Sequence, residues 1–169
     1  MYSFSKIAKF LVRADYYDKA CVMLDLPIEV KMEVARVANL IDVNKIDMEN
    51  GGIEDKAHIT VLYGVEDKVD LKKYFTKPIE IKIDNKVTYF DQKEFTVAKI
   101  EVFSDELKKL HYNIKKNEPN SHKYTYSPHI TIAYLKKGKR VDDIKIKPLE
   151  WTQREIALER NGLLDIVMI

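Results

Sequence analysis

Ala57-His-Ile-Thr-Val-Leu-Tyr63 and Pro128-His-Ile-Thr-Ile-Ala-Tyr134 are near repeats of each other. Each contains His-Ile-Thr between apolar residues, and an internal duplication explains two such matches better than chance does. Both stretches are rich in Ile, Thr, Val and Tyr, a composition that favours β-strands. Because side chains alternate between the two faces of a strand, His58 and Thr60 share one face, and His129 and Thr131 do the same in the second copy.

The other face of each repeated strand is expected to be apolar. It carries Ile59, Val61 and Tyr63 in the first copy, and Ile130, Ile132 and Tyr134 in the second. We expect these side chains to pack beneath helices, because an apolar strand face needs a covering layer. The two His-Thr faces then line a central cleft, and a two-fold relation between the copies makes them face each other.

Each repeat closes the same succession of strand, helix, polar loop and strand. In the first unit, a strand at 19–26 precedes a helix that Pro27 opens and a polar connector at 42–56. Helical spacing predicts the buried face of that helix as Ile28, Met32, Ala35, Ala38 and Ile41. In the second unit, a strand at 95–103 leads through the cap residue Ser104 into a helix, followed by a polar loop at 117–127. The predicted buried face of the second helix is Leu107, Leu110, His111 and Ile114.

The remaining segments complete an α+β fold. A strand at 79–90 forms a hairpin with 95–103, strands at 154–159 and 163–169 join through Asn161-Gly162, and a short helix is predicted at 5–12. The prediction is one bilobal domain, 1–169, of two antiparallel sheets related by a pseudo-two-fold axis, with outer helices and a central cleft. The first lobe covers about 19–75, the second about 95–135, and the C-terminal strands 154–169.

Composition narrows the class of protein. The chain has 169 residues, with 29 Lys and Arg against 27 Asp and Glu and a net charge of +2. This balance does not indicate a general nucleic-acid binder, so no duplex partner is expected, although 136–147 is locally basic. No apolar stretch suits a membrane helix or a signal peptide, so we expect a cytoplasmic protein without a membrane partner. Cys21, the only cysteine, excludes an intrachain disulfide and is expected to be a buried thiol.

The paired histidines indicate acid–base chemistry. Two imidazoles on opposite sides of one substrate suit a reaction that removes a proton at one end and delivers one at the other. Phosphodiester cleavage is such a reaction, and the hydroxyls of Thr60 and Thr131 can donate hydrogen bonds to phosphoryl oxygens. The predicted catalytic residues are therefore His58, Thr60, His129 and Thr131. No cofactor is predicted, and zinc is disfavoured because neither motif contains a second close ligand.

The paired motif resembles that of the 2H phosphoesterase superfamily, which is named for its two His-x-Thr/Ser motifs. Within it, His58-Ile-Thr-Val-Leu-Tyr-Gly64, Tyr126-Ser-Pro-His-Ile-Thr-Ile-Ala-Tyr-Leu135 and Met23-Leu-Asp-Leu-Pro27 are similar to phage anti-CBASS nucleases. The resemblance implies metal-independent degradation of the cyclic di- and trinucleotide messengers of a bacterial antiviral system. It also implies that a 2′-hydroxyl attacks the phosphate, which leaves a 2′,3′-cyclic phosphate.

Other substrates and a different class of function stay open at this point. The same site suits a 2′,3′-cyclic phosphate at an RNA end or a 2′,5′-linked oligonucleotide, and a non-catalytic sponge would bind a cyclic nucleotide without turnover. Tyr126 and Trp151 are candidates for stacking on a base, with packing as the alternative for each. The sequence leaves open which histidine is the acid and which the base, and what the oligomeric state is.

Overall fold

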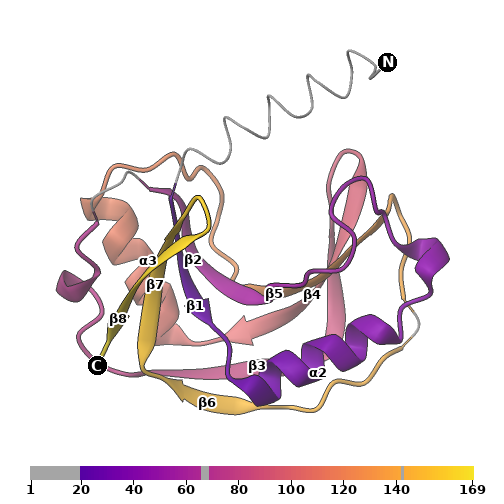
Figure 1. Ribbon diagram of the computed structural model, residues 1–169, viewed down its shortest axis with the longest axis horizontal. Helices are drawn as coiled ribbons and strands as arrows, with labels where there is room; N and C mark the ends of the chain where they lie inside the picture. Colours follow the sequence, from indigo (N-terminus) through magenta and orange to yellow (C-terminus); the bar gives the residue numbers. More distant parts are fainter. Residues whose placement is uncertain (1–19, 66–68, 142) are drawn as a thin grey trace.

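The computed structural model describes residues 20–65, 69–141 and 143–169 (Figure 1). The helix predicted at 5–12 lies outside the described residues. In chain order the elements are β1 (Ala20–Asp25), α2 (Ile28–Asn39), η1 (Val43–Lys45), β2 (His58–Val65), η2 (Leu71–Lys73), β3 (Ile79–Asp91), β4 (Phe95–Phe103), α3 (Asp105–Asn117), β5 (His129–Lys136), β6 (Glu150–Gln153), β7 (Glu155–Arg160) and β8 (Leu163–Met168). No helix among these residues is long and apolar enough to cross a membrane.

The strands form one eight-stranded sheet in the order β6-β3-β4-β5-β2-β1-β7-β8. We call β2, β1, β7 and β8 the first half-sheet, and β5, β4, β3 and β6 the second half-sheet. The two halves meet where the motif strands β2 and β5 pair through Ile59 and Ile130. The predicted α+β fold of antiparallel strands is confirmed, with the difference that the two expected sheets are continuous through this junction.

The duplication extends to the strand register. In the first half-sheet Leu24 of β1 lies opposite Ile59, and in the second half-sheet Ile100 of β4 lies opposite Ile130. Each pair of strands has a register shift at the same place, between Val22 and Met23 in β1 and between Ala98 and Lys99 in β4. Each motif strand therefore carries a β-bulge immediately after its His-Ile-Thr.

The bulges correct one prediction about side-chain direction. Strict alternation would place Tyr63 with Ile59 on the apolar face, but the extra residue at each bulge reverses the later part of the strand. Tyr63 lies opposite Cys21 while Thr60 lies opposite Met23, and Cys21 and Met23 are on one face of β1. Tyr63, and by the same register Tyr134, therefore lie on the face that carries the histidines.

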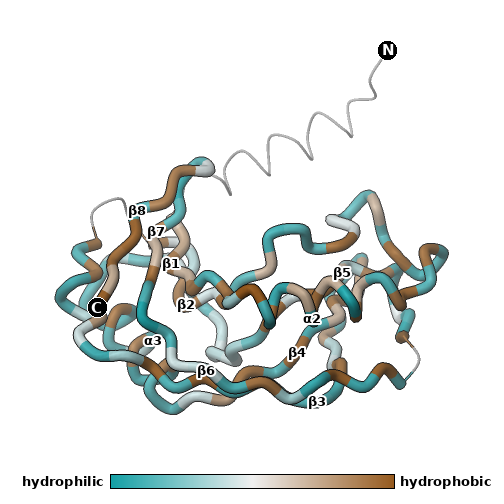
Figure 2. The backbone as a smooth tube through the Cα atoms, turned by 60° about the horizontal axis from the view of Figure 1, so that its bottom comes forward, coloured by the Kyte–Doolittle hydropathy of each residue, from teal (hydrophilic) through white to brown (hydrophobic). Residues whose placement is uncertain are grey.

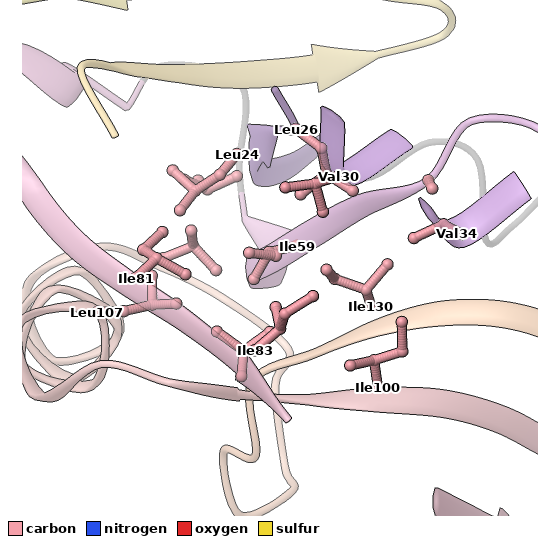
Figure 3. Close-up of a cluster of buried hydrophobic side chains, with 14 of the residues drawn as sticks. Leu24, Leu26, Val30, Val34, Ile59, Ile81, Ile83, Ile100, Leu107 and Ile130 are labelled. Atoms are coloured by element: carbon pink, nitrogen blue, oxygen red, sulfur yellow. The ribbon is translucent and has the colours of Figure 1, made fainter. Parts of the chain in front are cut away.

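The helices cover the other face of the sheet. Each helix packs against the motif strand of the other unit, because α2 contacts β5 whereas α3 contacts β2. Figure 3 shows how Val30 and Val34 of α2 gather with Ile59, Ile100 and Ile130 into one apolar cluster. The junction of the two half-sheets is thus the centre of the core.

The buried face predicted for α2 is largely wrong. Ala38 and Ile41 are buried as predicted, but Ile28 and Met32 are 63% and 66% exposed and Ala35 is exposed as well. Val30, Val34 and Val37 are the buried side chains in their place. Both sets have helical spacing, so periodicity alone could not choose between them.

The predictions for α3 and for the last hairpin are confirmed. Ser104 caps α3 by accepting a hydrogen bond from the Leu107 amide at 3.2 Å, and the predicted apolar face is buried. The turn between β7 and β8 uses Asn161 and Gly162 with φ of 51° and 80°, as a two-residue hairpin requires. In Figure 2 much of β8 is brown, because this strand is largely apolar, and it forms one edge of the sheet.

Each polar connector crosses to the other half-sheet and runs along the motif strand there. The connector before β2 runs along β5, where the Glu54 amide donates to the Ile132 carbonyl at 2.9 Å. The loop before β5 runs along β2, where the Ser121 amide donates to the Gly64 carbonyl at 3.0 Å. Each connector therefore satisfies backbone groups of the opposite motif strand beyond the junction.

Candidate active site

The structure brings the two His-Thr pairs together on one face of the sheet. His58 and Thr60 of β2, and His129 and Thr131 of β5, are all half-buried, while Ile59 and Ile130 between them are fully buried beneath. We call this surface the motif face. The side chains converge because β2 and β5 are neighbours that meet at the residues between each His and Thr.

Both histidines are held in the same orientation. His58 donates from Nδ1 to the carbonyl of Lys56 at 2.8 Å, and His129 donates from Nδ1 to the carbonyl of Ser127 at 2.8 Å. A carbonyl oxygen only accepts, so these bonds place a proton on Nδ1 and leave Nε2 for a substrate. Two imidazoles with a free Nε2 can take and give protons at one phosphate.

The surroundings of His129 lower its pKa. Burial is the main cause, because it disfavours the charged imidazolium, while the hydrogen bond to Ser127 acts in the opposite direction. The charge of Lys99 lowers the pKa further, that of Glu101 raises it, and that of His58 lowers it. Phe90 of β3 contributes to the burial with an edge contact at 5.6 Å between ring centroids.

A partly buried ion pair lies beside the second motif, and the sequence analysis missed it. Lys99, only 6% exposed, donates from Nζ to Glu101 two residues along β4. Thr88 also donates to Glu101 at 3.1 Å, and Ser127 does so at 3.5 Å. Burial is the largest single effect and raises the pKa of Glu101, but the hydrogen bond and charge of Lys99, the hydrogen bond from Thr88 and the charge of His129 together outweigh it, so the net shift is downward.

The first half has different side chains at the same places. In the strand register, Lys99 lies opposite Thr131 and Glu101 opposite His129, whereas Met23 lies opposite Thr60 and Asp25 opposite His58. Asp25 pairs with Lys31 at 2.7 Å, and both side chains of this pair are exposed. The sequence contained a signal for this ion pair. Lys99 and Glu101 are charged residues at alternate positions of a mainly apolar strand, and they correspond to Met23 and Asp25 when the two repeats are aligned.

Tyr126 lies next to the first motif, but its polar and aromatic groups are already engaged. Its hydroxyl donates to the Thr60 carbonyl at 3.0 Å, and its ring stacks on His111 with centroids 3.9 Å apart. His111 is fully buried and donates from Nδ1 to the Val61 carbonyl at 2.6 Å. Tyr126 and His111 therefore hold the bulged segment of β2 in place.

Cys21 is a buried thiol, as the sequence predicts. Burial, which dominates over a hydrogen bond with Thr60, raises its pKa to about 12. A thiol with such a pKa stays protonated at neutral pH and is a poor nucleophile. Cys21 is therefore part of the packing beside Thr60.

The structure does not bring Trp151 to the motif residues. Trp151 of β6 lies opposite Ile81 of β3, which is 2% exposed, and it packs against the core on the helix-covered side. Its indole donates to Gln153 at 2.9 Å. Two strands separate β6 from β5, so Trp151 differs from the motif residues both in face and in position.

Two further features bear on the kind of site. Within 20–65, 69–141 and 143–169, no group of three His, Cys, Asp or Glu side chains is placed to hold a metal ion. A pocket between 74–79 and the helix α3 is lined by Leu110 and Asn113 among others, away from the motif face. The pocket is thus separate from the paired histidines of the motif face.

Solved structures of known proteins share this fold. The chain is similar to TT0787 of Thermus thermophilus, with a TM-score of 0.61 and 14% identity over 89% of this chain and 94% of that one. It is similar to Escherichia coli LigT complexed with 3′-AMP, with a TM-score of 0.60 and 12% identity over 90% and 95% of the two chains. Usb1 of Kluyveromyces marxianus matches with a TM-score of 0.56 and 7% identity over 92% and 100%. No curated protein matches the sequence.

The fold is shared with these solved structures, one of which is described as a phosphoesterase, and the paired histidine motifs are those of the 2H phosphoesterase class. A family model described as "Anti-CBASS protein Acb1" matches residues 26–161. The chain belongs to this anti-CBASS family, and the resemblance given by the motifs is confirmed.

Proposed function

We propose that this protein cleaves cyclic di- and trinucleotide second messengers of bacterial antiviral signalling, in the cytoplasm of the infected cell. The observation that carries the proposal is the symmetric presentation of two imidazole Nε2 atoms and two threonine hydroxyls on one face, in a chain of an anti-CBASS family. The substrate brings its own nucleophile, because a 2′-hydroxyl lies beside each 3′,5′-linked phosphate.

In this mechanism the protein transfers two protons and stabilises the negative charge that develops on the phosphate. One histidine takes the proton of the 2′-hydroxyl as O2′ attacks phosphorus, and the other protonates the leaving O5′. Thr60 and Thr131 donate hydrogen bonds to the non-bridging oxygens, where negative charge develops. The products are a 2′,3′-cyclic phosphate and a free 5′-hydroxyl.

A surface for the nucleobase extends from the first motif. Met23, Ala157 and Ile166 follow Thr60 in register across β1, β7 and β8 on the motif face. Ile166 is 52% exposed, so this apolar row is open to a ligand at its outer end. Solved structures of LigT hold 3′-AMP, ATP and NADP+, which supports a small nucleotide as the substrate here.

The test is a substrate panel in the presence of EDTA. It contains a 3′,3′-cyclic dinucleotide, a cyclic trinucleotide, a 2′,5′-oligoadenylate and an RNA ending in a 2′,3′-cyclic phosphate, with products resolved by chromatography and mass. We expect the cyclic messengers to be linearised to 2′,3′-cyclic phosphate ends, without inhibition by EDTA.

Each other result has a definite meaning. Cleavage of only the RNA end or the 2′,5′ linkage would assign the same site to RNA processing and overturn the messenger as substrate. Tight binding of a cyclic dinucleotide without product would indicate a sponge. Inhibition by EDTA that zinc reverses would show that the reaction depends on a metal.

A further inference from the structure

We propose that the two halves of the site have different roles: Lys99 supplies a fixed positive charge to the phosphate at the second motif, His129 is the general base and His58 is the general acid. The inference rests on the proposed function, because it divides the work of that same site. Neither motif includes Lys99, and the symmetry of the motifs alone assigns no direction to the reaction.

The position of Lys99 suits contact with a phosphate. It lies on the motif face opposite Thr131, and its Nζ is 5.8 Å from the centroid of the Phe90 ring that touches His129. Glu101 takes only one of the three hydrogen-bond donors of the ammonium. Because Thr88 and Ser127 also hold Glu101, the cation is anchored and cannot swing away as an exposed lysine would.

The charges around His129 favour the role of base. A general base must be neutral before the reaction, and Lys99 on β4 and His58 on β2 both oppose a positive charge on His129. Glu101 on β4 favours that charge, but its carboxylate is bound to Lys99. Burial of the ring acts in the same direction as Lys99 and His58.

In the first half, an apolar side chain stands where the second half has Lys99. Met23 takes that position in the register, and Lys31, which pairs with Asp25, is an exposed residue. Asp25, which carries a carboxylate, lies opposite His58 in the strand register. At the register position that Lys99 takes in the second half, the first half therefore has no cation, and the acid role falls to His58.

The reaction then runs in one direction with protons and bonds balanced. The O2′ proton moves to Nε2 of His129 while the O2′–P bond forms, and the P–O5′ bond breaks while Nε2 of His58 gives its proton to O5′. Lys99 and Thr131 bind the non-bridging oxygens, and the two histidines return to their starting states by exchange with water.

The direction is tested with a leaving group that needs no acid. We would measure the His58→Ala and His129→Ala variants on the dinucleotide linkage and on its analogue with sulfur in place of O5′, because a thiolate departs without protonation. We expect the analogue to restore turnover in His58→Ala and not in His129→Ala. Selective rescue of His129→Ala, or of both or neither variant, would overturn the assignment.

The role of Lys99 is tested by substitution with the residue of the first half. Lys99→Met should lower kcat/KM by about 10- to 100-fold, the loss expected for a charged hydrogen bond, and Lys99→Arg should restore part of it. The matched control is Lys31→Met, which removes the lysine paired to Asp25 and should leave turnover unchanged. Equal turnover in Lys99→Met and wild type would overturn the proposal.

An NMR titration of the histidine ring protons needs no substrate and separates this inference from the proposed function. The pKa of His129 should rise in Lys99→Met and fall in Glu101→Gln, while Lys31→Met should leave it unchanged. An unchanged pKa in both β4 variants would overturn the inference, whatever the substrate. Should a single variant fail to fold, the double variant Lys99→Met/Glu101→Gln removes both partners, and its turnover should stay as low as predicted for Lys99→Met.

Discussion

The two halves of the active site share a backbone and differ in the side chains that surround it. Each half presents a histidine whose Nδ1 is bonded to the carbonyl two residues earlier, and each has a bulge directly after its His-Ile-Thr. The neighbouring strands differ, with Met23 and Asp25 in one half and Lys99 and Glu101 in the other. Duplication therefore supplies two imidazoles in the same orientation, and divergence of the adjacent strands gives them different surroundings.

The largest effect should come from removing either histidine. General acid and base catalysis each contribute about 10²- to 10⁴-fold, so His58→Ala and His129→Ala should each lower kcat by such a factor. Because both rings are half-buried at the surface, the melting temperature should change little. Steady-state kinetics with thermal unfolding as the control measures both, and full activity in either variant would remove that histidine from the mechanism.

The double variant sharpens the comparison. If the histidines act in one concerted step, His58→Ala/His129→Ala should lose little more activity than the worse single variant. Fully multiplicative losses would instead indicate that the two halves act in separate steps.

The core beneath the site should respond equally in both halves. Ile59 and Ile130 are fully buried and lie opposite each other at the junction of the half-sheets. Ile59→Ala and Ile130→Ala should each lower the free energy of unfolding by about 2–5 kcal/mol, because each leaves a cavity in packed surroundings. Urea denaturation measures the loss, and the conservative variants Ile59→Val and Ile130→Val should lose only about 0.5–1.5 kcal/mol.

A difference between these two positions would be informative. A much smaller loss for one of them would show that only one half-sheet depends on the junction for its stability. The symmetric packing of α2 on β5 and α3 on β2 argues for equal losses.

Removing the threonine hydroxyls should also affect the two halves differently, with smaller losses of activity than removing the histidines. Valine keeps the shape of threonine and removes the hydroxyl donor, so Thr60→Val should lower kcat/KM by about tenfold, the value of one hydrogen bond to a developing charge. Thr131→Val should cost less, because Lys99 stands beside it and still supplies a donor to the phosphate. A larger loss for Thr131→Val than for Thr60→Val would contradict this use of Lys99.

The sequence was enough to predict the elements that repeat a local pattern. The His-Ile-Thr strands, the capped helix α3 and the Asn161-Gly162 hairpin each follow from spacing or turn chemistry and are confirmed. The short strand β6, at 150–153, was missed because its four residues carry no alternation of their own and pair only with β3.

The failures at the site have a common physical cause. The direction of Tyr63 and the neighbourhood of His129 both depend on which strand pairs with which, and at what register. A bulge or a cross-strand contact joins residues far apart in the chain, so no local pattern predicts it. In the sequence alone, Lys99 is one of many charged residues, and its place in the site follows only from the pairing of β4 with β5. Trp151 is excluded from the site only by the position of β6 at the edge of the sheet.

The smallest expected effect concerns the ion pair of the first half. Lys31 and Asp25 are bonded at 2.7 Å, but both side chains are exposed, so water screens the attraction and each residue loses conformational freedom. Lys31→Met should therefore change the free energy of unfolding by less than about 1 kcal/mol. Removing one partner of the buried pair, as in Lys99→Met, should cost more, because Glu101 is then left partly buried without its cation. Urea denaturation of the two variants side by side measures the difference, and equal losses would mean that the two ion pairs are energetically alike despite their unequal burial.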